Sequence, residues 1–373
     1  MRTNLANRPW FWAMFGLALA AAVPAAACSV PVFRYSLERW PAEPYRVYVF
    51  HRGALSPETQ KLVDRLQTAA GTRTTAGPIE LAVIDVAGKP DEDAAAIYKR
   101  HESATLPLMV VCYPADLEIA AEVWAGPLAA EAVDRLLDSP ARRQIAKRII
   151  EGEAGVFLVL ESGDRAKDDA AADLLKTELA RLEKVLKLPA PDDGQWGDPV
   201  YDEKGPPPLR LAFSFVRMAR SDPAEAMFVK MLLGAGPIPG SDEGPVVFPF
   251  FGRGRALAAL AGKNFDAAAI EDVCEFMGGP CSCIIKGQNP GVDMLMNVDW
   301  DAALAGQESA IPKVEPPPLT GVGAFAKAGA AATEGDARTS LWQNVAVAVV
   351  VGVAIIAVLA AVMARRRRGS GSN

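Results

Sequence analysis

The chain is poor in the residues from which most enzyme active sites are built. Its 373 residues include two histidines, His51 and His101, and five cysteines. A Ser-His-Asp triad or a multi-histidine metal site therefore has little to draw on. No G-x-S-x-G motif occurs, and the glycine-rich stretch 236–241 lacks the lysine of a phosphate-binding loop. These absences argue against triad hydrolases and nucleotide-binding enzymes, and we expect no bound cofactor.

The charge of the chain excludes a further class of partner. The formal net charge is −6, but six of the 39 basic residues lie outside residues 28–364. That segment holds the other 33 basic residues and all 45 acidic ones, so its net charge is −12. A surface this acidic repels nucleic acid and anionic lipid headgroups. We therefore expect no nucleic-acid partner.

One long apolar run lies near the C-terminus. Leu341–Met363 contains no charged residue and is followed by Arg365–Arg368. As a helix rising about 1.5 Å per residue, it is long enough for a hydrocarbon core of about 30 Å. A polybasic segment after such a run is typical of the cytoplasmic side of a membrane. The sequence predicts a transmembrane helix over 341–364 and a basic cytoplasmic tail over 365–373, in preference to a buried soluble helix.

The N-terminus has the features of a secretory signal peptide. Residues 1–27 combine two arginines, a short apolar core and small residues before a cleavage site. The run Ala25–Cys28 resembles a bacterial lipobox, which implies a lipid on Cys28; ordinary cleavage would leave Cys28 free or disulfide-bonded. We expect a single-pass protein of the bacterial cytoplasmic membrane, with its main part outside the cytoplasm and its tail inside.

Residues 28–150 alternate between strand and helix patterns. Strands are expected at Tyr45–Phe50 and Ile79–Val86, and a third strand opens with Leu106-Pro107. Helices are expected between them, the first after the Ser56-Pro57 cap. Over about a hundred residues this order resembles the thioredoxin fold. The resemblance implies that Pro107 follows a cis peptide bond and faces the active site.

The next segment, 151–304, repeats the arrangement. A strand at Gly155–Leu160 precedes an amphipathic helix at Asp168–Leu188, and Val246–Phe251 reads as a strand containing a proline, Pro249. By the same resemblance Pro249 is the second cis-proline position. We therefore expect an α/β fold class: two tandem thioredoxin-like domains and a C-terminal transmembrane helix, joined by an Ala/Gly/Pro-rich linker over 305–340. The competing interpretation of 151–304 is a part of one larger α/β domain.

The resemblance also shows what is missing. Thioredoxin-like oxidoreductases carry C-x-x-C after the first strand, where a helix N-terminus lowers a thiol pKa. Here those positions are His51–Ser56 in the first copy and Glu161–Asp164 in the second, and neither contains a cysteine. Both copies are predicted to be redox-inactive at that site, with His51 an exposed loop residue.

The remaining cysteines lie elsewhere in the chain. Cys112 lies in an apolar strand pattern and is expected to be buried. Cys274, Cys281 and Cys283 cluster in sequence. A disulfide from Cys274 to Cys281 or Cys283 is the first expectation for a secreted protein. A vicinal Cys281–Cys283 pair, or a Cu(I) or Zn site formed by the three thiolates, remains the alternative.

Together these patterns favour a protein that binds rather than transforms. We expect a membrane-tethered, extracytoplasmic binding or scaffold module with a protein partner, for example as the accessory subunit of an export or transport complex. The alternative is a thiol-disulfide oxidoreductase or a Cu(I)/Zn-binding protein that uses Cys274, Cys281 and Cys283. No catalytic residue is predicted for the first of these functions.

Overall fold

The computed structural model describes residues 30–305, apart from 72–76, 118, 190–210 and 282–284. These residues all belong to one of the two compact units into which the chain divides, and the second unit begins at Lys313. The predicted signal peptide, Cys28, the linker and the basic tail lie outside the described residues.

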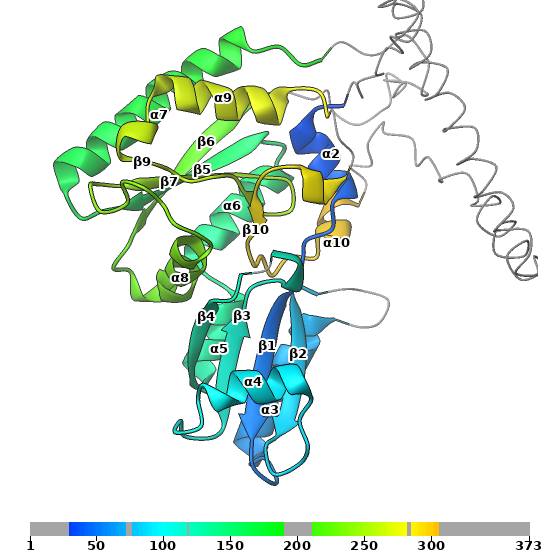
Figure 1. The fold of residues 1–373 in the computed structure, drawn as a ribbon. Coiled ribbons are helices and arrows are strands. Elements are labelled where there is room, and N and C mark those ends of the chain that lie inside the picture. The colour runs from blue at the N-terminus through cyan, green and yellow to red at the C-terminus, as the bar shows by residue number, and fades with distance from the viewer. Residues whose placement is uncertain (1–29, 72–76, 118, 190–210, 282–284, 306–373) are drawn as a thin grey trace, which may run out of the picture. The chain divides into compact units, whose positions relative to one another are not determined.

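The first sheet has four strands in the order β2-β1-β3-β4 (Figure 1). The parallel pair is β1 (Tyr45–His51) and β2 (Ile79–Asp85), and the antiparallel strands are β3 (Leu108–Cys112) and β4 (Glu122–Pro127). Three helices belong to this sheet: α3 (Pro57–Ala70), α4 (Glu92–Lys99) and α5 (Ala130–Leu137). Ser56 and Asp91 cap α3 and α4. Each side chain accepts a hydrogen bond from the backbone N–H of the third residue of its helix, as such side chains do at helix starts.

The second sheet has the order β10-β8-β7-β5-β6, and β9 also pairs with β7. Its strands are β5 (Gly155–Glu161), β6 (Phe213–Ala219), β7 (Val246–Phe251), β8 (Arg255–Ala256), β9 (Leu260–Ala261) and β10 (Val292–Asp293). Its helices are α6 (Pro140–Ile150), α7 (Arg165–Val185), α8 (Ala226–Gly234), α9 (Ala267–Gly278) and α10 (Trp300–Leu304). Alternate residues of β5 enter two different hydrophobic clusters, because helices cover both faces of this sheet.

The two sheets share one core topology. In both, the first strand pairs in parallel with the second and antiparallel with the third, and the fourth is antiparallel to the third. The register coincides as well. Phe50, next to last in β1, lies opposite Leu108, the first residue of β3. Leu160, next to last in β5, lies opposite Val246, the first residue of β7. Equivalent positions in the two sheets can therefore be assigned residue by residue.

The fold class predicted from the sequence needs one correction. The structure is α/β with two mixed sheets, but the residues that it describes include no helix with the length and apolarity needed to cross a membrane. The third component of the predicted class, a transmembrane helix at Leu341–Met363, is therefore not supported. That stretch lies outside the described residues. The thioredoxin-like family stays a resemblance.

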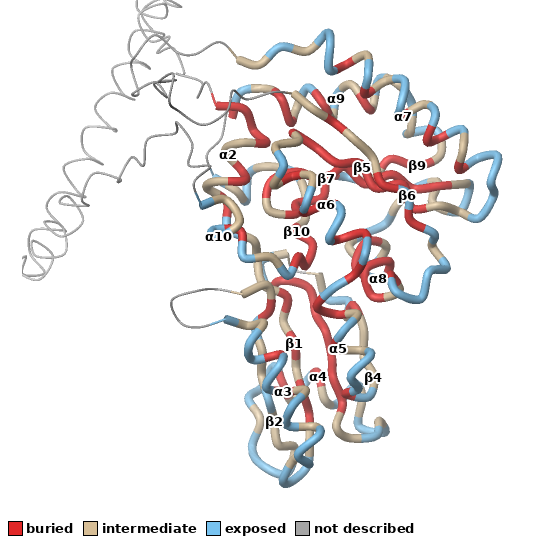
Figure 2. The backbone as a smooth tube through the Cα atoms, turned by 180° about the vertical axis from the view of Figure 1, so that it is seen from behind, coloured by how far each residue is buried: buried red, intermediate tan, exposed pale blue. Residues whose placement is uncertain are grey.

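One hydrophobic core runs from the first sheet into the second. It includes side chains of β1, α3 and α5 together with those of α6, α8 and β5, and Figure 2 shows these strands buried. Helix α8 of the second sheet packs against β4 and α5 of the first. Tyr113 adds a polar contact, since its hydroxyl donates to Met231 O at 2.8 Å. The two sheets are therefore packed on each other through side chains of both.

The N-terminal helix α2 (Val32–Arg39) packs on the second sheet, although it precedes the first in the chain (Figure 1). Val32 N donates to Gly279 O at 2.9 Å, and Cys281 N donates to Val30 O at 2.9 Å. The helix buries Val32 and Phe33 in the same cluster as α7 and α9. The predicted division into 28–150 and 151–304 stays a prediction, and both α2 and α6 lie before residue 151 yet pack on the second sheet.

Candidate functional site

The matching register locates two prolines at the start of a third strand. Pro107 directly precedes β3, and its counterpart is Pro245, which directly precedes β7. The Leu106–Pro107 peptide bond is cis, as the resemblance implied, and it is the only cis bond among the described residues. The expectation for Pro249 is wrong. Pro249 lies inside β7 opposite Phe157, four residues beyond the position that corresponds to Pro107.

The loop after β1 is held by the carboxylate of Asp85. Gly53 N donates to both of its oxygens at 3.2 and 3.3 Å, and Ala87 N donates at 2.9 Å. These N–H groups, Ala87 first, lower the pKa of Asp85. The half-buried His51 directs Nδ1 to Gly53 O at 2.8 Å. The His51 side chain thus contacts the backbone of the loop that follows it. Gly53 has the positive φ of 68° that favours glycine.

The loop after β5 is held by a buried carboxylate, that of Asp168. It accepts from Ser162 N and Ser162 Oγ, both at 2.8 Å, and from Gly163 N at 3.0 Å. Asp164 caps α7 by accepting from Ala166 N at 3.1 Å. The sequence does not reveal the role of Asp168, because an acidic residue in the first turn of a helix is usually exposed. The two loops therefore have fixed conformations and no cysteine.

Beside the second loop lies a groove, here called the Pro245 groove, with a volume of about 320 Å³. It lies between the first half of α7, the segment before β7 and the turn after β9. Its lining consists of Lys167, Ala170, Ala171, Leu174, Glu243, Gly244, Pro245, Gly262 and Phe265. This lining is mainly apolar, and it contains no cysteine, serine, threonine, tyrosine or histidine.

The polar groups of the Pro245 groove are few and partly engaged. Lys167 Nζ donates to Glu243 O at 2.7 Å, which ties the start of α7 to the segment before β7. Gly262 has a φ of 53°, and a Cβ there would lie 2.8 Å from a carboxylate oxygen of Glu243. The geometry therefore offers an apolar cavity with one cation and one carboxylate at its edge, and this suits recognition of a side chain better than catalysis.

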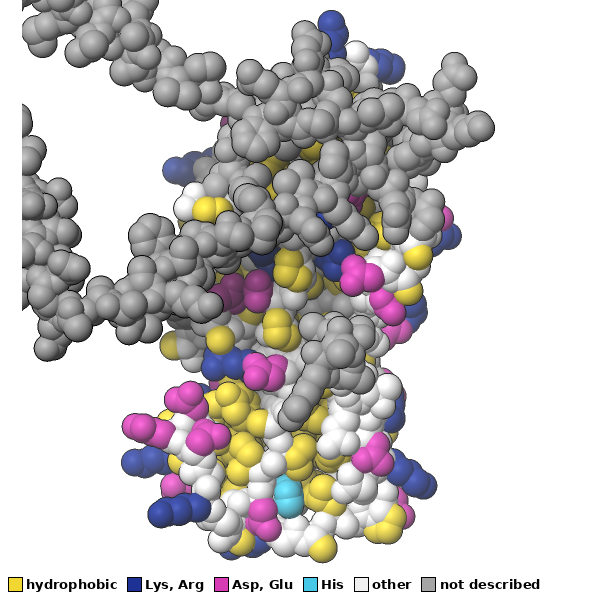
Figure 3. Space-filling model, turned by 90° about the vertical axis from the view of Figure 1, so that its right-hand side faces the viewer, with side chains coloured by type: hydrophobic (Ala, Val, Ile, Leu, Met, Phe, Trp, Pro, Cys, Tyr) yellow, Lys and Arg dark blue, Asp and Glu magenta, His cyan; other side chains and the backbone are white. Residues whose placement is uncertain are grey.

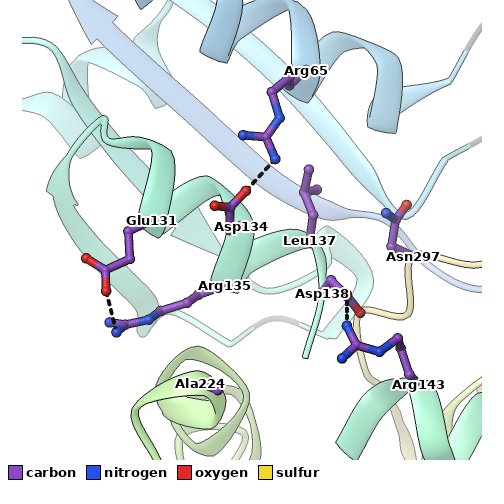
Figure 4. A pocket seen from close by; sticks show the side chains of 9 residues that line it. All are labelled: Arg65, Glu131, Asp134, Arg135, Leu137, Asp138, Arg143, Ala224 and Asn297. Carbon is purple, nitrogen blue, oxygen red and sulfur yellow. Dashed lines mark hydrogen bonds and ion pairs between the residues drawn. The ribbon is translucent and has the colours of Figure 1, made fainter. Parts of the chain in front are cut away.

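A larger pocket of about 590 Å³ lies beside α5 (Figure 4). Its walls carry equal numbers of arginines and carboxylates, and each arginine is paired within the pocket. The pairs are Arg65 with Asp134 at 2.5 Å, Arg135 with Glu131 at 2.6 Å, and Arg143 with Asp138. A ligand would have to displace these exposed pairs, so this pocket is the weaker candidate.

No protein-family model matches the chain, and no curated protein matches it. The Pro245 groove has no cysteine, serine, threonine, tyrosine or histidine in its lining, and its two charged groups are Lys167 and Glu243.

The cysteines do not form the expected disulfide within the described residues. Cys274 on α9 is a buried free thiol, so it is not joined to Cys281, which is buried in the same cluster. Burial, and then the carboxylates of Glu183 and Glu271, raise the pKa of Cys274 well above its usual range. No group of three metal-binding side chains exists among the described residues. Cys28 and Cys283 lie outside them.

The Cys274 thiol is therefore expected to resist alkylation in the folded protein. Iodoacetamide at pH 8 should modify it at least about tenfold more slowly than an exposed cysteine, because thiolate is the reactive form and burial lowers its fraction tenfold per pKa unit. Mass spectrometry of peptides from native and urea-unfolded samples measures this ratio, with Cys112 as a second buried thiol. Rapid modification of Cys274 in the native state would contradict the described burial and revive a thiol-based function.

Proposed function

We propose that this protein is an extracytoplasmic binding module, tethered to a membrane, that holds an extended segment of a partner protein in the Pro245 groove. The observation that carries the proposal is the groove itself, a mainly apolar cavity with one lysine and one carboxylate at its edge, next to the proline that opens a third strand. Location outside the cytoplasm and tethering rest on the sequence of residues 1–28 alone.

The shape of the groove suits one large apolar side chain of a peptide. Its volume of about 320 Å³ lies at the small end of ligand pockets. Ala170 is exposed and Ala171 is buried, and the small side chains of these alanines leave room for a ligand where the groove opens. Phe265 and Leu174 supply apolar walls, which favour desolvation of an aromatic or branched side chain.

The alternative thiol-based function has less support. A redox or soft-metal site needs accessible thiolates, whereas Cys274 is fully buried and its pKa is raised. Nothing in the Pro245 groove supplies a thiol either. Binding is therefore the function that the geometry favours.

Peptide selection tests the proposal directly. A random-peptide phage library is selected on the purified chain, and the affinities of enriched peptides are measured by fluorescence anisotropy. Enriched peptides are expected to share an apolar anchor residue. Ala170→Trp should weaken their binding at least about tenfold, because an indole at this exposed position fills the groove.

Ala180→Trp is the matched control. Ala180 is also an exposed alanine of α7, but it lies ten residues, or about 15 Å, further along the helix. Peptide affinity should be unchanged by this substitution. Equal losses from both substitutions, or a selection that enriches no peptide, would overturn the proposal.

A further inference from the structure

The two charged side chains of the Pro245 groove differ in how they are engaged. Lys167 Nζ donates to the backbone oxygen of Glu243 at 2.7 Å and lies 4.0 Å from a carboxylate oxygen of Asp164. The Glu243 carboxylate has neither a hydrogen bond nor an ion pair with another described residue. The positive charge of the groove is therefore partly balanced within the protein, whereas the negative charge is left for a ligand.

The Glu243 carboxylate lies beside the turn after β9. A Cβ at Gly262 would be 2.8 Å from Glu243 Oε2, so this oxygen lies close to the Gly262 backbone. Both residues belong to the groove lining, and Glu243 is exposed. Lys263 follows Gly262, but it is exposed and lies outside the lining. A cation that enters the groove on this side therefore meets a carboxylate that is not yet paired.

We propose that the partner segment carries a lysine or arginine within two residues of its apolar anchor, and that Glu243 binds this cation. The inference rests on the function proposed for the Pro245 groove and specifies the chemistry of the partner. The anchor packs against the apolar walls formed by Leu174 and Phe265, and the basic side chain reaches the carboxylate at the edge. A hydrogen bond between two charged groups is stronger than one between neutral groups.

The charge of the whole chain acts in the same direction. Residues 28–364 have a net charge of −12, and this field attracts a basic segment and speeds its encounter with the protein. An acidic segment would be repelled by the same field and would bring a second carboxylate close to Glu243. Charge complementarity therefore favours a partner that is both apolar and basic.

Peptides selected on the full chain test this chemistry. Enriched peptides should carry a lysine or arginine within two residues of the anchor. One such peptide and its derivative with glutamine at the basic position are compared by fluorescence anisotropy, on the unsubstituted chain and on Glu243→Gln. The substitution should weaken the basic peptide about fivefold, as expected for one exposed ion pair, and leave the glutamine peptide unchanged.

Asp242→Asn is the matched control. Asp242 is the neighbouring exposed carboxylate, but it does not line the groove. Both substitutions remove one negative charge from the same loop, so an effect of the general field would be equal in the two variants. We expect Asp242→Asn to change the affinity of the basic peptide less than twofold. Because Glu243 and Asp242 are both exposed, the fold should tolerate either change.

The outcomes separate this inference from the proposed function. If Ala170→Trp weakens binding but Glu243→Gln does not, or if the enriched peptides carry an acidic residue beside the anchor, the inference is overturned and the groove stands. Equal losses from Glu243→Gln and Asp242→Asn would overturn it as well. Peptides that are insensitive to both Ala170→Trp and Glu243→Gln would overturn the inference and the proposed function together. Such peptides would bind elsewhere, for example on the hydrophobic side chains gathered in the lower part of Figure 3.

Discussion

Replacing Arg142 with methionine is expected to lower the free energy of unfolding by about 3–5 kcal/mol. Arg142 on α6 is buried between the two sheets. Its guanidinium donates to Leu136 O at 2.8 Å, Arg135 O at 2.6 Å and Leu295 O at 3.2 Å. These acceptors belong to the end of α5 and to the segment after β10, so one side chain joins three parts of the fold.

Burial destabilises the charged form of Arg142, but removing its side chain would lower the stability of the fold further. Desolvation lowers the pKa of Arg142 to about 10, and the nearby carboxylate of Glu225 opposes that shift. Glu225 is itself buried: one oxygen accepts from Ala141 N at 2.7 Å and the other has no hydrogen-bond partner. Methionine would leave this carboxylate without its neighbouring cation and three carbonyl groups without their donor.

Urea unfolding followed by circular dichroism measures the effect. Arg143→Met is the matched control, because Arg143 is the next residue and forms an exposed pair with Asp138. Its loss should cost less than about 1 kcal/mol. Equal stability of the Arg142→Met and Arg143→Met variants would contradict the role of Arg142 at the junction.

The protein is also expected to lose stability above pH 10, because two buried tyrosines lie at the same junction. The rings of Tyr45 and Tyr113 are 5.7 Å apart, and the Tyr45 hydroxyl donates to Asp293 O at 3.2 Å. Burial raises the pKa of both phenols well above their usual value. In the unfolded chain these phenols ionise near pH 10.

The direction of this pH effect follows from the number of protons that the folded and unfolded states bind. Above about pH 10 the folded state retains phenol protons that the unfolded state releases, so stability is complete below pH 10 and falls as the pH rises. For two phenols the loss at pH 11 relative to pH 8 is about 3 kcal/mol. The lowered pKa of Arg142 acts in the opposite direction over the same range and offsets part of this loss.

The Tyr45→Phe/Tyr113→Phe variant isolates the contribution of the tyrosines. At pH 8 it should be less stable than the unsubstituted protein by about 1 kcal/mol per lost hydrogen bond. Between pH 8 and pH 11, however, it should lose about 3 kcal/mol less. Urea unfolding at the two pH values gives both quantities, and identical pH dependence in the two proteins would contradict the burial of these phenols.

The sequence predicts much of the local structure correctly, because strand patterns and helix caps are local signals. The strands beginning at Tyr45 and Gly155 and the Ser56-Pro57 helix start are examples. Strand register could not be predicted from the sequence, because it depends on pairing between distant segments. The two prolines Pro245 and Pro249 flank the same short apolar run, and only the pairing of β5 with β7 shows that Pro245 corresponds to Pro107.

Contacts between distant segments also escaped prediction. The apolar residues of α2 give no indication that their partners lie on α9, more than two hundred residues later. The lining of the Pro245 groove comes from three separate segments and consists mainly of small or apolar residues, with one lysine and one glutamate, so it forms no motif in the sequence. Arg142 likewise reads as one of several basic residues on an exposed helix, whereas the fold buries it.

Hydrogen exchange with a selected peptide bound tests the central claim most directly. Binding in the Pro245 groove predicts slower amide exchange at Lys167–Leu174 on α7 and in the segment before β7 that contains Gly244. Strands β1–β4 should exchange at the same rate with and without peptide. Protection confined to the first sheet, or to the pocket around Arg65 and Asp134, would contradict the account.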